Sequence, residues 1–449
     1  MRSMDVGAEF KGKKITVMGL GLLGGVGDIK FLAESGADII ATDLKSEEDA
    51  KASVEILQKF SNVRFMLGRH ELADFRGRDL IIKAPGSPID SPFILEARKE
   101  GTPITMWAAL FAGFAREVGA TIVGVTGTRG KTTVTEMLVA ILRAASKDVI
   151  EGGNVQGTSL LSHLASVTSE TIVVLELDSW KLQGFGEARL SPHIAVFTTF
   201  YADHMNYYKN DMGAYLADKA NIFLNQTKSD TLVLGKQCAP TIIEKYSERI
   251  EANTIVADEL KLPDTWTLQM PGLHNRYNAA LALAAARALG IADSVSRAAI
   301  ESFRGVPGRL ELVREVNGVK VYNDTTSTTP EATLAALSAL GNVGHRKSYN
   351  LILILGGADK GLDMSALIAR LPETKRVILL AGTGTDQLVS KSDFDTNEIF
   401  DTLAAAVADA FAHAEEGDII LLSPAFASFG MFKNEYDRGE QFNKIVTVV

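Results

Sequence analysis

The chain has 449 residues, of which 46% are hydrophobic and 22% charged, as in ordinary soluble globular proteins. This composition excludes a disordered chain, a coiled-coil rod and a collagen-like repeat, and the length favours about three domains. The formal net charge of −9 argues against a non-specific nucleic-acid binder, which needs a surplus of cations on one face. The single cysteine, Cys238, excludes an internal disulfide and a thiolate metal site, and we expect it to be a buried or incidental thiol.

No apolar run approaches the roughly 18 residues that span a bilayer. The N-terminal segment MRSMDVGAEFKGKK lacks the apolar core of a secretory signal. We therefore expect a cytoplasmic protein with no membrane partner and no nucleic-acid partner.

Short β-branched runs alternate with helix-length segments, which predicts an α/β protein with parallel sheets covered by helices on both faces. The first block contains predicted strands at 13–20, 37–43, 63–67 and 79–86. The second contains strands at 121–128, 171–178, 193–200 and 231–235, and it ends on an Ala- and Leu-rich helix over 279–289. The third contains strands at 319–324, 349–357, 376–382 and 418–425.

Two segments, 109–119 and 303–308, are predicted to join these blocks. We therefore predict three domains, over 1–110, 111–305 and 306–449. Ligands of open α/β sheets bind at the carboxyl ends of the strands, and many of the predicted strands end on glycine or polar residues. These edges are expected to face a common cleft.

The first motif, GLGLLG at Gly19–Gly24, follows a predicted strand and fits the G-x-G-x-x-G pattern. Its glycines allow a tight turn and close approach of the backbone to a diphosphate. Asp43 ends the next strand, where a carboxylate can bind a ribose hydroxyl. The motif alone favours nucleotide binding, and the alternative is that the glycines only let strand and helix pack closely.

The second motif, TGTRGKTT at Thr126–Thr133, lies between a predicted strand and a predicted helix. Gly130, Lys131 and Thr132 form the core of a phosphate-binding loop. Backbone N–H groups at the helix start bind phosphates, the lysine neutralises their charge and the threonine hydroxyl coordinates Mg²⁺. The loop is short because its first glycine is Gly127. This strongest signal of the chain predicts a nucleoside triphosphate and argues against nicotinamide.

Three polar residues follow in the same block. Glu176 ends a strand, where its carboxylate can reach a Mg²⁺ held by the phosphate loop, and an ordinary strand-end carboxylate is the alternative. His204 follows another strand at the same sheet edge, and a structural histidine is its alternative. Lys219 lies on a predicted helix, and its spacing alone favours a solvated lysine.

Further polar residues lie at element ends. Asn275 and Asn278 stand at a helix start, where Asn275 could be an N-cap and the amide of Asn278 suits an adenine edge or a phosphate. Arg309, Asp324 and Lys360 lie in predicted loops at strand ends of the third block. Each of these three signals is weak alone.

Together these segments resemble the Mur ligase family over nearly the whole chain. The short T-G-T-x-G-K-T loop is typical of that family and of its folylpolyglutamate synthase relatives. LELDSWKL resembles the family's E-L-S-S-F-Q-L, and TTFYADHMNYY resembles its N-x-x-x-D-H-x-x-x-Y. GLHNRYNAA and VPGRLE complete the series, and the GGADKGLD and SPAFASF segments favour the branch that adds D-glutamate.

The resemblance implies a Rossmann-like uridine-nucleotide domain, a P-loop ATPase-type central domain and a Rossmann-like C-terminal domain. It implies ATP-dependent amide formation in peptidoglycan biosynthesis. In that reaction the carboxylate of UDP-N-acetylmuramoyl-L-alanine attacks ATP, and D-glutamate then attacks the acyl phosphate. Two Mg²⁺ ions spread the negative charge. The partners are small molecules, and a monomer is expected.

The resemblance also carries residue roles. The catalytic positions are Lys131, Glu176, His204, Lys219 and Arg309. The metal ligands are Thr132, Glu176, His204 and Lys219, the last as a carbamate formed with CO₂. The ATP-binding positions are Gly127, Thr128, Gly130, Lys131, Thr132, Thr133, Asn275, Asn278, Arg309 and Asp324. The UDP-substrate positions are Gly21, Leu22, Leu23, Asp43, Lys45, Gly86 and Asn154. The amino-acid positions are Thr328, Lys360 and Ser428.

Some positions depart from the family's pattern. In the ATP-binding block these are Arg129, Asp178, Trp180 and Lys181, and they should leave the ATP chemistry intact. Thr326 stands where the family has a lysine, and Glu435 stands where the family often has a phenylalanine. These two changes remove a positive charge and add a negative one near the expected dicarboxylate, which weakens the case for D-glutamate.

Three other functions stay open. One is a related ligase with another acceptor or amino acid, including a folylpolyglutamate synthase, although GLGLLG with Asp43 argues against folate. Another is an NAD-dependent oxidoreductase with an accidental phosphate loop. The last is a nucleotide-binding regulatory protein without catalysis, which would bind ATP but release no phosphate.

Overall fold

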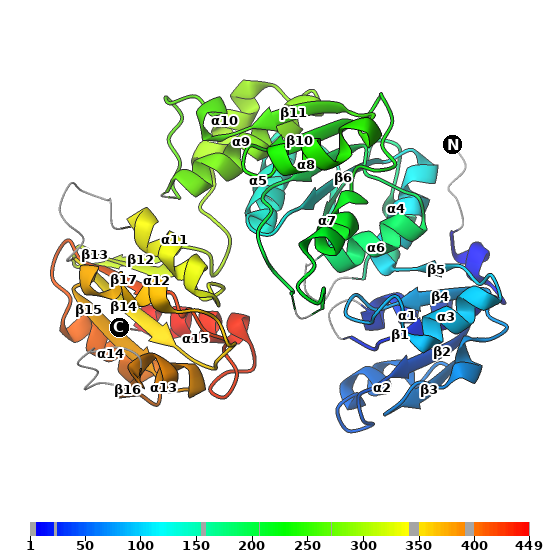
Figure 1. Ribbon diagram of the computed structural model, residues 1–449, viewed down its shortest axis with the longest axis horizontal. Coiled ribbons are helices and arrows are strands. Elements are labelled where there is room, and N and C mark those ends of the chain that lie inside the picture. The colour runs from blue at the N-terminus through cyan, green and yellow to red at the C-terminus, as the bar shows by residue number, and fades with distance from the viewer. Residues whose placement is uncertain are drawn as a thin grey trace. The chain divides into compact units, whose positions relative to one another are not determined.

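The computed structural model describes residues 6–21, 25–153, 159–205, 207–270, 272–340, 350–390 and 399–448. The chain divides into two compact units. One unit contains Met1–Asp264 and Tyr277–Ile300 and holds two sheets, which are blue and cyan to green in Figure 1. The other contains Thr265–Arg276 and Glu301–Val449 and holds the third sheet, yellow to red. The α/β class is confirmed.

The first sheet is entirely parallel, with the strand order β3-β2-β1-β4-β5. Its strands are β1 (Lys14–Met18), β2 (Asp38–Asp43), β3 (Val63–Leu67), β4 (Leu80–Lys83) and β5 (Ile104–Thr105). Its helices are α1 (Gly25–Glu34), α2 (Lys51–Leu57) and α3 (Pro92–Lys99). The strand order reverses between β1 and β4, so ligands are expected where the loops after these two strands meet.

The second sheet is also parallel, with the order β11-β10-β9-β6-β8-β7. Its strands are β6 (Thr121–Thr126), β7 (Val149–Gly152), β8 (Ile172–Glu176), β9 (Ile194–Phe197), β10 (Thr231–Gly235) and β11 (Asn253–Ala257). The helices of this region are α4 (Trp107–Val118), α5 (Lys131–Ala144), α6 (Ser179–Glu187), α7 (Met212–Ala220), α8 (Ala239–Tyr246), α9 (Leu273–Ala288) and α10 (Asp293–Ser302). Strands β8 and β9 are buried along their whole length, as expected for central strands of a parallel sheet.

The third sheet has the order β12-β13-β17-β14-β15-β16. Its strands are β12 (Glu311–Val316), β13 (Val319–Asn323), β14 (Leu351–Gly356), β15 (Arg376–Leu380), β16 (Ile399–Phe400) and β17 (Ile419–Leu422). Its helices are α11 (Pro330–Leu340), α12 (Ser365–Ile368), α13 (Thr383–Ser390), α14 (Leu403–Ala412) and α15 (Glu435–Val448). Every predicted strand is present in the three sheets, whereas β5, β7, β11, β12 and β16 were not predicted.

Strand β12 also departs from the expected parallel pairing, because it forms an antiparallel hairpin with β13. Asn317 and Gly318 turn the chain there with φ of +50° and +77°, which suits a two-residue hairpin. Charged residues on the outer face of β12 obscure the alternation that predicts a strand. The Asn-Gly pair was the feature of the sequence that could have predicted the hairpin.

The predicted joint at 109–119 lies within α4, which is a packed helix. Ala109, Phe111, Ala112 and Ala115 are buried in a core that spans the first and second sheets. The helix ends at Gly119, whose φ of +96° is typical of a left-handed C-cap. The three predicted domain ranges stay predictions.

Cys238 is fully buried, as the sequence led us to expect, and its thiol lies 3.2 Å from the carbonyl oxygen of Gly235. Burial raises the pKa of this thiol to about 12. In the part of the chain that the structure describes, no helix is long and apolar enough to cross a membrane.

Candidate active site

The phosphate loop joins the end of β6 to the start of α5. Gly127 has φ +141° and Gly130 has φ +84°, conformations that favour glycine. A Cβ at Gly127 would collide with the hydroxyl of Thr198, and one at Gly130 would lie 2.5 Å from Oδ1 of Asn278. The local packing and the backbone conformation therefore both require glycine at these two positions.

Residues that follow β9 hold this loop in shape. The N–H of Thr128 donates to the carbonyl oxygen of Thr199 at 2.7 Å, and the N–H of Arg129 donates to the hydroxyl of Thr199 at 2.9 Å. The hydroxyl of Thr198 donates to the carbonyl oxygen of Arg129 at 2.5 Å. Lys131 Nζ donates to the carbonyl oxygen of Thr128 at 3.2 Å. The loop is therefore fixed by protein contacts of its own.

The first turn of a helix presents backbone N–H groups that bind phosphate oxygens. Here that turn begins at Lys131 and includes Thr132 and Thr133. Asn278, 6% exposed on α9, lies against Gly130 at the same place. Asn275 is the third residue of α9, so it lies within the first turn and is not the N-cap. It is buried and belongs to the other compact unit.

Lys219 is fully buried near the end of α7, so the expectation of a solvated lysine is wrong. Its Nζ donates to the carbonyl oxygen of Gly127 at 2.9 Å and lies 3.4 Å from the Thr126 hydroxyl. Burial lowers its pKa well below the ordinary value, and the charge of Lys131 lowers it further, against three nearby carboxylates. The neutral amine is therefore favoured, and that form reacts with CO₂.

Glu176 ends β8 beside β6, where it pairs in register with Val125, one residue before the loop begins. It is 5% exposed. Thr132 lies in the first turn of α5. Carboxylate and hydroxyl oxygens are donors that Mg²⁺ prefers, so this set fits the ion. Among the described residues, no group of three His, Cys, Asp or Glu side chains could hold a metal alone, so other ligands are needed.

His204 follows β9 and has φ +56°. Its ring lies 4.5 Å from that of Trp180, tilted by 47°, and Nε2 lies 3.8 Å from Asp203 Oδ2. Burial lowers the pKa of His204, the charges of Lys219 and Lys131 also lower it, and the Asp203 carboxylate opposes them. The neutral imidazole, which is the metal-binding form, is favoured.

Asp178 and Lys181, two of the departures from the family's pattern, form an ion pair at the start of α6. Asp178 Oδ1 accepts the Lys181 N–H at 2.8 Å, and Oδ2 lies 2.6 Å from Nζ. Burial raises the pKa of Asp178, but the charge and hydrogen bonds of Lys181 outweigh burial and lower it overall. The Lys181 charge is thereby neutralised within the site.

At the first sheet, Asp43 joins the loops after β1 and β2. Its Oδ2 accepts the N–H of Leu20 at 2.7 Å, and its Oδ1 accepts the N–H of Lys45 at 3.0 Å. The structure thus brings Asp43 and Lys45 to the glycine loop. The carboxylate has a structural task there in addition to the predicted ribose contact.

The loop after β4 packs against the same glycine loop. Gly19 has φ +104°, and a Cβ on it would lie 2.6 Å from Cβ of Ala84. Gly21 and Gly86 both have open space around them, so a ligand can approach their backbone closely. Three predicted residues lie outside the described part of the chain: Leu22, Leu23 and Asn154.

Lys83 is a residue that the sequence analysis missed. It ends β4 and is 1% exposed, and its Nζ donates to the carbonyl oxygens of Ser87, Ala84 and Pro85 at 2.7, 3.1 and 3.3 Å. Burial lowers its pKa to about 8, opposed by nearby carboxylates. Lys83 therefore fixes the loop that contains Gly86. A lysine in an otherwise apolar strand was the signal.

In the second compact unit, Asp324 follows β13 and has internal donors for both carboxylate oxygens. Oδ1 accepts the N–H of Leu310 at 3.1 Å, and Oδ2 accepts the hydroxyl of Ser423 at 2.8 Å. Burial raises its pKa to about 6, against these hydrogen bonds and the charge of Arg309. Arg309 is half-buried, and Asp324 has little exposed surface for a ribose hydroxyl.

The predicted amino-acid residues also lie in this unit. Lys360 Nζ donates to the hydroxyl of Thr328 at 2.9 Å. Ser428 is buried and directly follows Ala427, which pairs with Ala358 in a short antiparallel bridge. The fold thus brings Thr328 and Lys360 together and places Ser428 one residue beyond the bridge.

Arg438 is a second residue that the sequence analysis did not identify. It is fully buried on α15, where Nε donates to the Thr325 hydroxyl at 3.0 Å and Nη2 to the Thr325 carbonyl oxygen at 2.8 Å. The Thr325 hydroxyl in turn donates to the carbonyl oxygen of Glu435 at 2.8 Å. The neighbouring Thr326 donates to the carbonyl oxygen of Gly308 at 3.0 Å. The substituted positions Thr326 and Glu435 therefore border one hydrogen-bonded network, and an arginine within a helix was the available signal.

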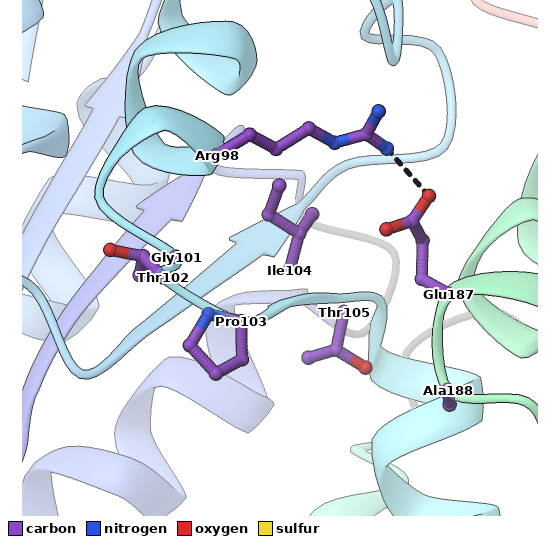
Figure 2. Close-up of a pocket in the computed structure, with 8 residues that line it drawn as sticks. All are labelled: Arg98, Gly101, Thr102, Pro103, Ile104, Thr105, Glu187 and Ala188. Carbon is purple, nitrogen blue, oxygen red and sulfur yellow. Dashed lines mark hydrogen bonds and ion pairs between the residues drawn. The ribbon is translucent and has the colours of Figure 1, made fainter.

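A pocket of about 360 Å³ lies elsewhere in the first unit (Figure 2). Its lining residues are Arg98, Gly101, Thr102, Pro103, Ile104, Thr105, Glu187 and Ala188. Figure 2 shows Arg98 of α3 facing Glu187 of α6, with Nη2 and Oε1 2.5 Å apart. None of the predicted site residues lines this pocket.

Three family models match successive parts of the chain. Residues 13–106 match the family model described as Mur ligase MurD-like, N-terminal domain. Residues 125–261 match the Mur ligase middle domain, and residues 308–426 match the Mur ligase, glutamate ligase domain.

Relatives match nearly end to end. The chain is 38% identical to the UDP-N-acetylmuramoylalanine–D-glutamate ligase of Roseiflexus sp. (strain RS-1), covering 98% of this chain and 99% of the relative. It is 33% identical to the ligase of the same name from Borreliella burgdorferi (strain ZS7), with 98% of each covered. The fold is similar to that of the UDP-N-acetylmuramate–alanine ligase MurC of Thermotoga maritima, at a TM-score of 0.59 and 19% identity, covering 97% and 99%. The chain therefore belongs to the Mur ligase family.

Proposed function

We propose that this protein is an ATP-dependent ligase that joins D-glutamate to UDP-N-acetylmuramoyl-L-alanine, in peptidoglycan biosynthesis. The observation that carries the chemistry is the buried amine of Lys219 bonded to the phosphate loop beside Glu176. Hydride transfer by a dehydrogenase does not require such an arrangement. The choice of substrates is supported by the names of relatives that are 38% and 33% identical over nearly the full chain.

In the first step, a carboxylate oxygen of the acceptor attacks the γ-phosphorus of ATP. The bond from this phosphorus to the β,γ-bridging oxygen breaks, which gives an acyl phosphate and ADP. Lys131 and the first turn of α5 neutralise and orient the phosphates, and Arg309, Asn275, Asn278 and Asp324 complete the proposed ATP site. Two Mg²⁺ ions, held through Thr132, Glu176, His204 and carbamylated Lys219, would supply charge neutralisation.

The carbamate of Lys219 forms when its neutral amine attacks the carbon of CO₂. A nitrogen–carbon bond forms, an electron pair of one C=O bond moves to oxygen, and a proton leaves the nitrogen for solvent. Burial favours the neutral amine that this step needs. The product carries anionic oxygen, so an amine that would repel Mg²⁺ if it were protonated becomes an anionic ligand.

In the second step, the amine nitrogen of the incoming amino acid attacks the acyl carbon. The nitrogen loses a proton to solvent, the bond from carbon to the phosphate oxygen breaks with its electron pair passing to that oxygen, and amide and phosphate result. Thr328, Lys360 and Ser428 would hold the carboxylates of the amino acid. The acceptor would lie between Gly21, Leu22, Leu23, Asp43, Lys45, Gly86 and Asn154. We infer that a cytoplasmic monomer does this work.

A related ligase with a different amino acid is the second candidate, favoured by Thr326 and Glu435. The test is phosphate release from ATP and Mg²⁺ with UDP-N-acetylmuramoyl-L-alanine and a panel of D- and L-amino acids. Release that depends on D-glutamate supports the proposal. Release with another amino acid supports the second candidate, and no release with any of them overturns both.

A further inference from the structure

Helices α6 and α7 lie side by side (Figure 1) and are joined by a largely buried hydrogen-bond network. Asp218 on α7 supplies the acceptor, because its Oδ2 accepts the hydroxyl of Tyr208 at 2.9 Å and Nε2 of Gln183 at 2.8 Å. Gln183 lies on α6 and is 5% exposed, and Tyr208 follows β9 and is 6% exposed. We call Gln183, Tyr208 and Asp218 the α6–α7 bridge.

The Tyr208 end of the bridge is bonded directly to His204. The N–H groups of Tyr207 and Tyr208 both donate to the carbonyl oxygen of His204, at 2.9 and 3.1 Å. His204 has φ +56°, a conformation that costs a non-glycine residue free energy and persists where the surroundings hold it. A shift of Tyr208 would therefore be passed to the backbone of His204.

The Asp218 end of the bridge adjoins Lys219. These consecutive residues of α7 point about 100° apart around the helix axis, so each contacts a different neighbour. Asp218 bonds to Gln183 of α6, whereas Lys219 Nζ donates to the carbonyl oxygen of Gly127 in the phosphate loop. Because α7 has nine residues, a bond beside Lys219 restricts rotation of the whole helix and limits where Nζ can lie.

His204 and Lys219 surround one aromatic ring. The centroid of the Tyr215 ring lies 6.4 Å from that of His204 and 4.9 Å from Lys219 Nζ. The ring of Trp180 on α6 contacts His204 from another direction, at 4.5 Å. The two proposed metal ligands are thus neighbours, and α6 and α7 both pack against them.

We propose that the α6–α7 bridge positions a divalent-cation site, because it holds His204 and Lys219 at the separation that one ion between them requires. This inference rests on the proposed function, in which both residues are metal ligands, the lysine as a carbamate. The three bridge side chains do not need to touch the ion or a substrate. Loss of such outer hydrogen-bond partners typically weakens metal binding by about 10- to 100-fold.

The test titrates Mn²⁺, which stands in for Mg²⁺, into the full-length protein equilibrated with bicarbonate, and electron paramagnetic resonance measures the free ion. In the wild type we expect the affinity for Mn²⁺ to rise with bicarbonate, because the carbamate supplies a ligand. Tyr208→Phe and Asp218→Ala should each weaken this bicarbonate-dependent affinity by about tenfold. Because the two residues share one hydrogen bond, the double variant should bind Mn²⁺ about as weakly as Asp218→Ala alone.

Tyr246→Phe is the matched control, because it removes one hydroxyl from another buried tyrosine. Tyr246 ends α8, where its ring packs on Phe223. Since α8 follows β10, it ends away from the carboxyl edge of the sheet. Circular dichroism checks the fold of each variant. Tyr208→Phe keeps the aromatic ring and its packing, so it decides the test if Asp218→Ala does not fold.

The outcomes separate the two proposals. Absence of acceptor-dependent phosphate release in the wild type overturns the proposed function, and this inference with it. An active wild type whose Tyr208→Phe and Asp218→Ala variants keep the Mn²⁺ affinity overturns the inference alone, as does wild-type Mn²⁺ binding that does not respond to bicarbonate. Equal weakening in Tyr246→Phe, or additive losses in the double variant, would assign the effect to general packing and would also overturn it.

Discussion

The phosphate-loop edge of the second sheet and the amino-acid edge of the third sheet are built in different ways. Around the phosphate loop, the backbone is fixed by contacts from β9 and from Lys219, and most positions follow the family's pattern. At the third sheet, the predicted residues are held by side chains, as in the contact of Lys360 with Thr328, and the charge-changing departures gather beside them. The contrast teaches that the edge of the second sheet is fixed largely through its backbone, whereas the edge of the third sheet depends on side chains, which substitutions can change one at a time.

The largest expected effects lie at the phosphate-loop edge. Lys131→Ala and Glu176→Ala should each lower kcat on the order of 1000-fold, because charge stabilisation at the transferring phosphate is lost. Phosphate release measures the activity, and circular dichroism checks that each variant is folded. Lys147→Ala, at an exposed position after α5, is the control. Activity above a tenth of the wild-type value would contradict a catalytic role for the substituted residue.

Lys219→Ala should be nearly as inactive, but a short carboxylate such as acetate should restore part of the activity. The reason is that acetate can supply the anionic oxygen of the missing carbamate. The measurement is phosphate release against acetate concentration, with Lys219→Arg expected to show no rescue. If acetate restores nothing at any concentration, the carbamate has lost its support.

Asp324 should make stability depend on pH. Its pKa is raised from 3.8 to about 6, so the folded state binds the proton more readily than the unfolded chain. Its stabilising contribution is present below about pH 4 and is lost as pH rises through about 6, by up to about 3 kcal/mol. Urea unfolding of wild type and Asp324→Asn across this range measures the difference. A difference that stays constant with pH would contradict this assignment.

Arg438→Met should lower the free energy of unfolding by about 2 kcal/mol, because the buried carbonyl of Thr325 loses its donor. KM for the amino acid should rise as well, since Thr325 lies in the segment that carries Thr328. Urea unfolding and steady-state kinetics measure the two effects. Arg304→Met, at an exposed arginine of the same compact unit, is the control. An unchanged KM for the amino acid would show that Arg438 has no role in binding the amino acid.

The smallest effect is expected from restoring the family's charges. Thr326→Lys should lower KM for D-glutamate by about tenfold, equivalent to about 1.4 kcal/mol, if D-glutamate is the true substrate. Glu435→Phe should act in the same direction. Kinetics with D-glutamate and with the amino acid that the panel favours provide the comparison. A rise in KM for D-glutamate would contradict the expected gain from a positive charge at position 326.

The two edges also differ in how well sequence alone predicts them. The phosphate loop is predictable because a strand, two glycines with special backbone needs and a helix start are all local features. The burial of Lys219 is not, because it depends on how α7 packs on a loop some 90 residues away. The resemblance to known ligases supplied that role, while spacing favoured solvent.

Lys83 and Arg438 escaped prediction for a similar reason. Each has a long basic side chain whose partners include backbone carbonyl oxygens, and every residue has such an oxygen, so the sequence does not identify the partners. Strand β12 escaped because its exposed face is charged, although Asn317 and Gly318 marked its turn. Sequence therefore predicts the loops that bind phosphate better than the buried polar groups that support them.

The burial of Cys238 has a practical consequence. Because this is the one thiol of the chain, and its thiolate forms only at high pH, maleimide reagents should leave the wild-type protein unmodified at neutral pH. Single cysteines can then be placed on each compact unit without first removing a native one. A pair of attached dyes would report the distance between the units while ATP, acceptor and amino acid bind in turn.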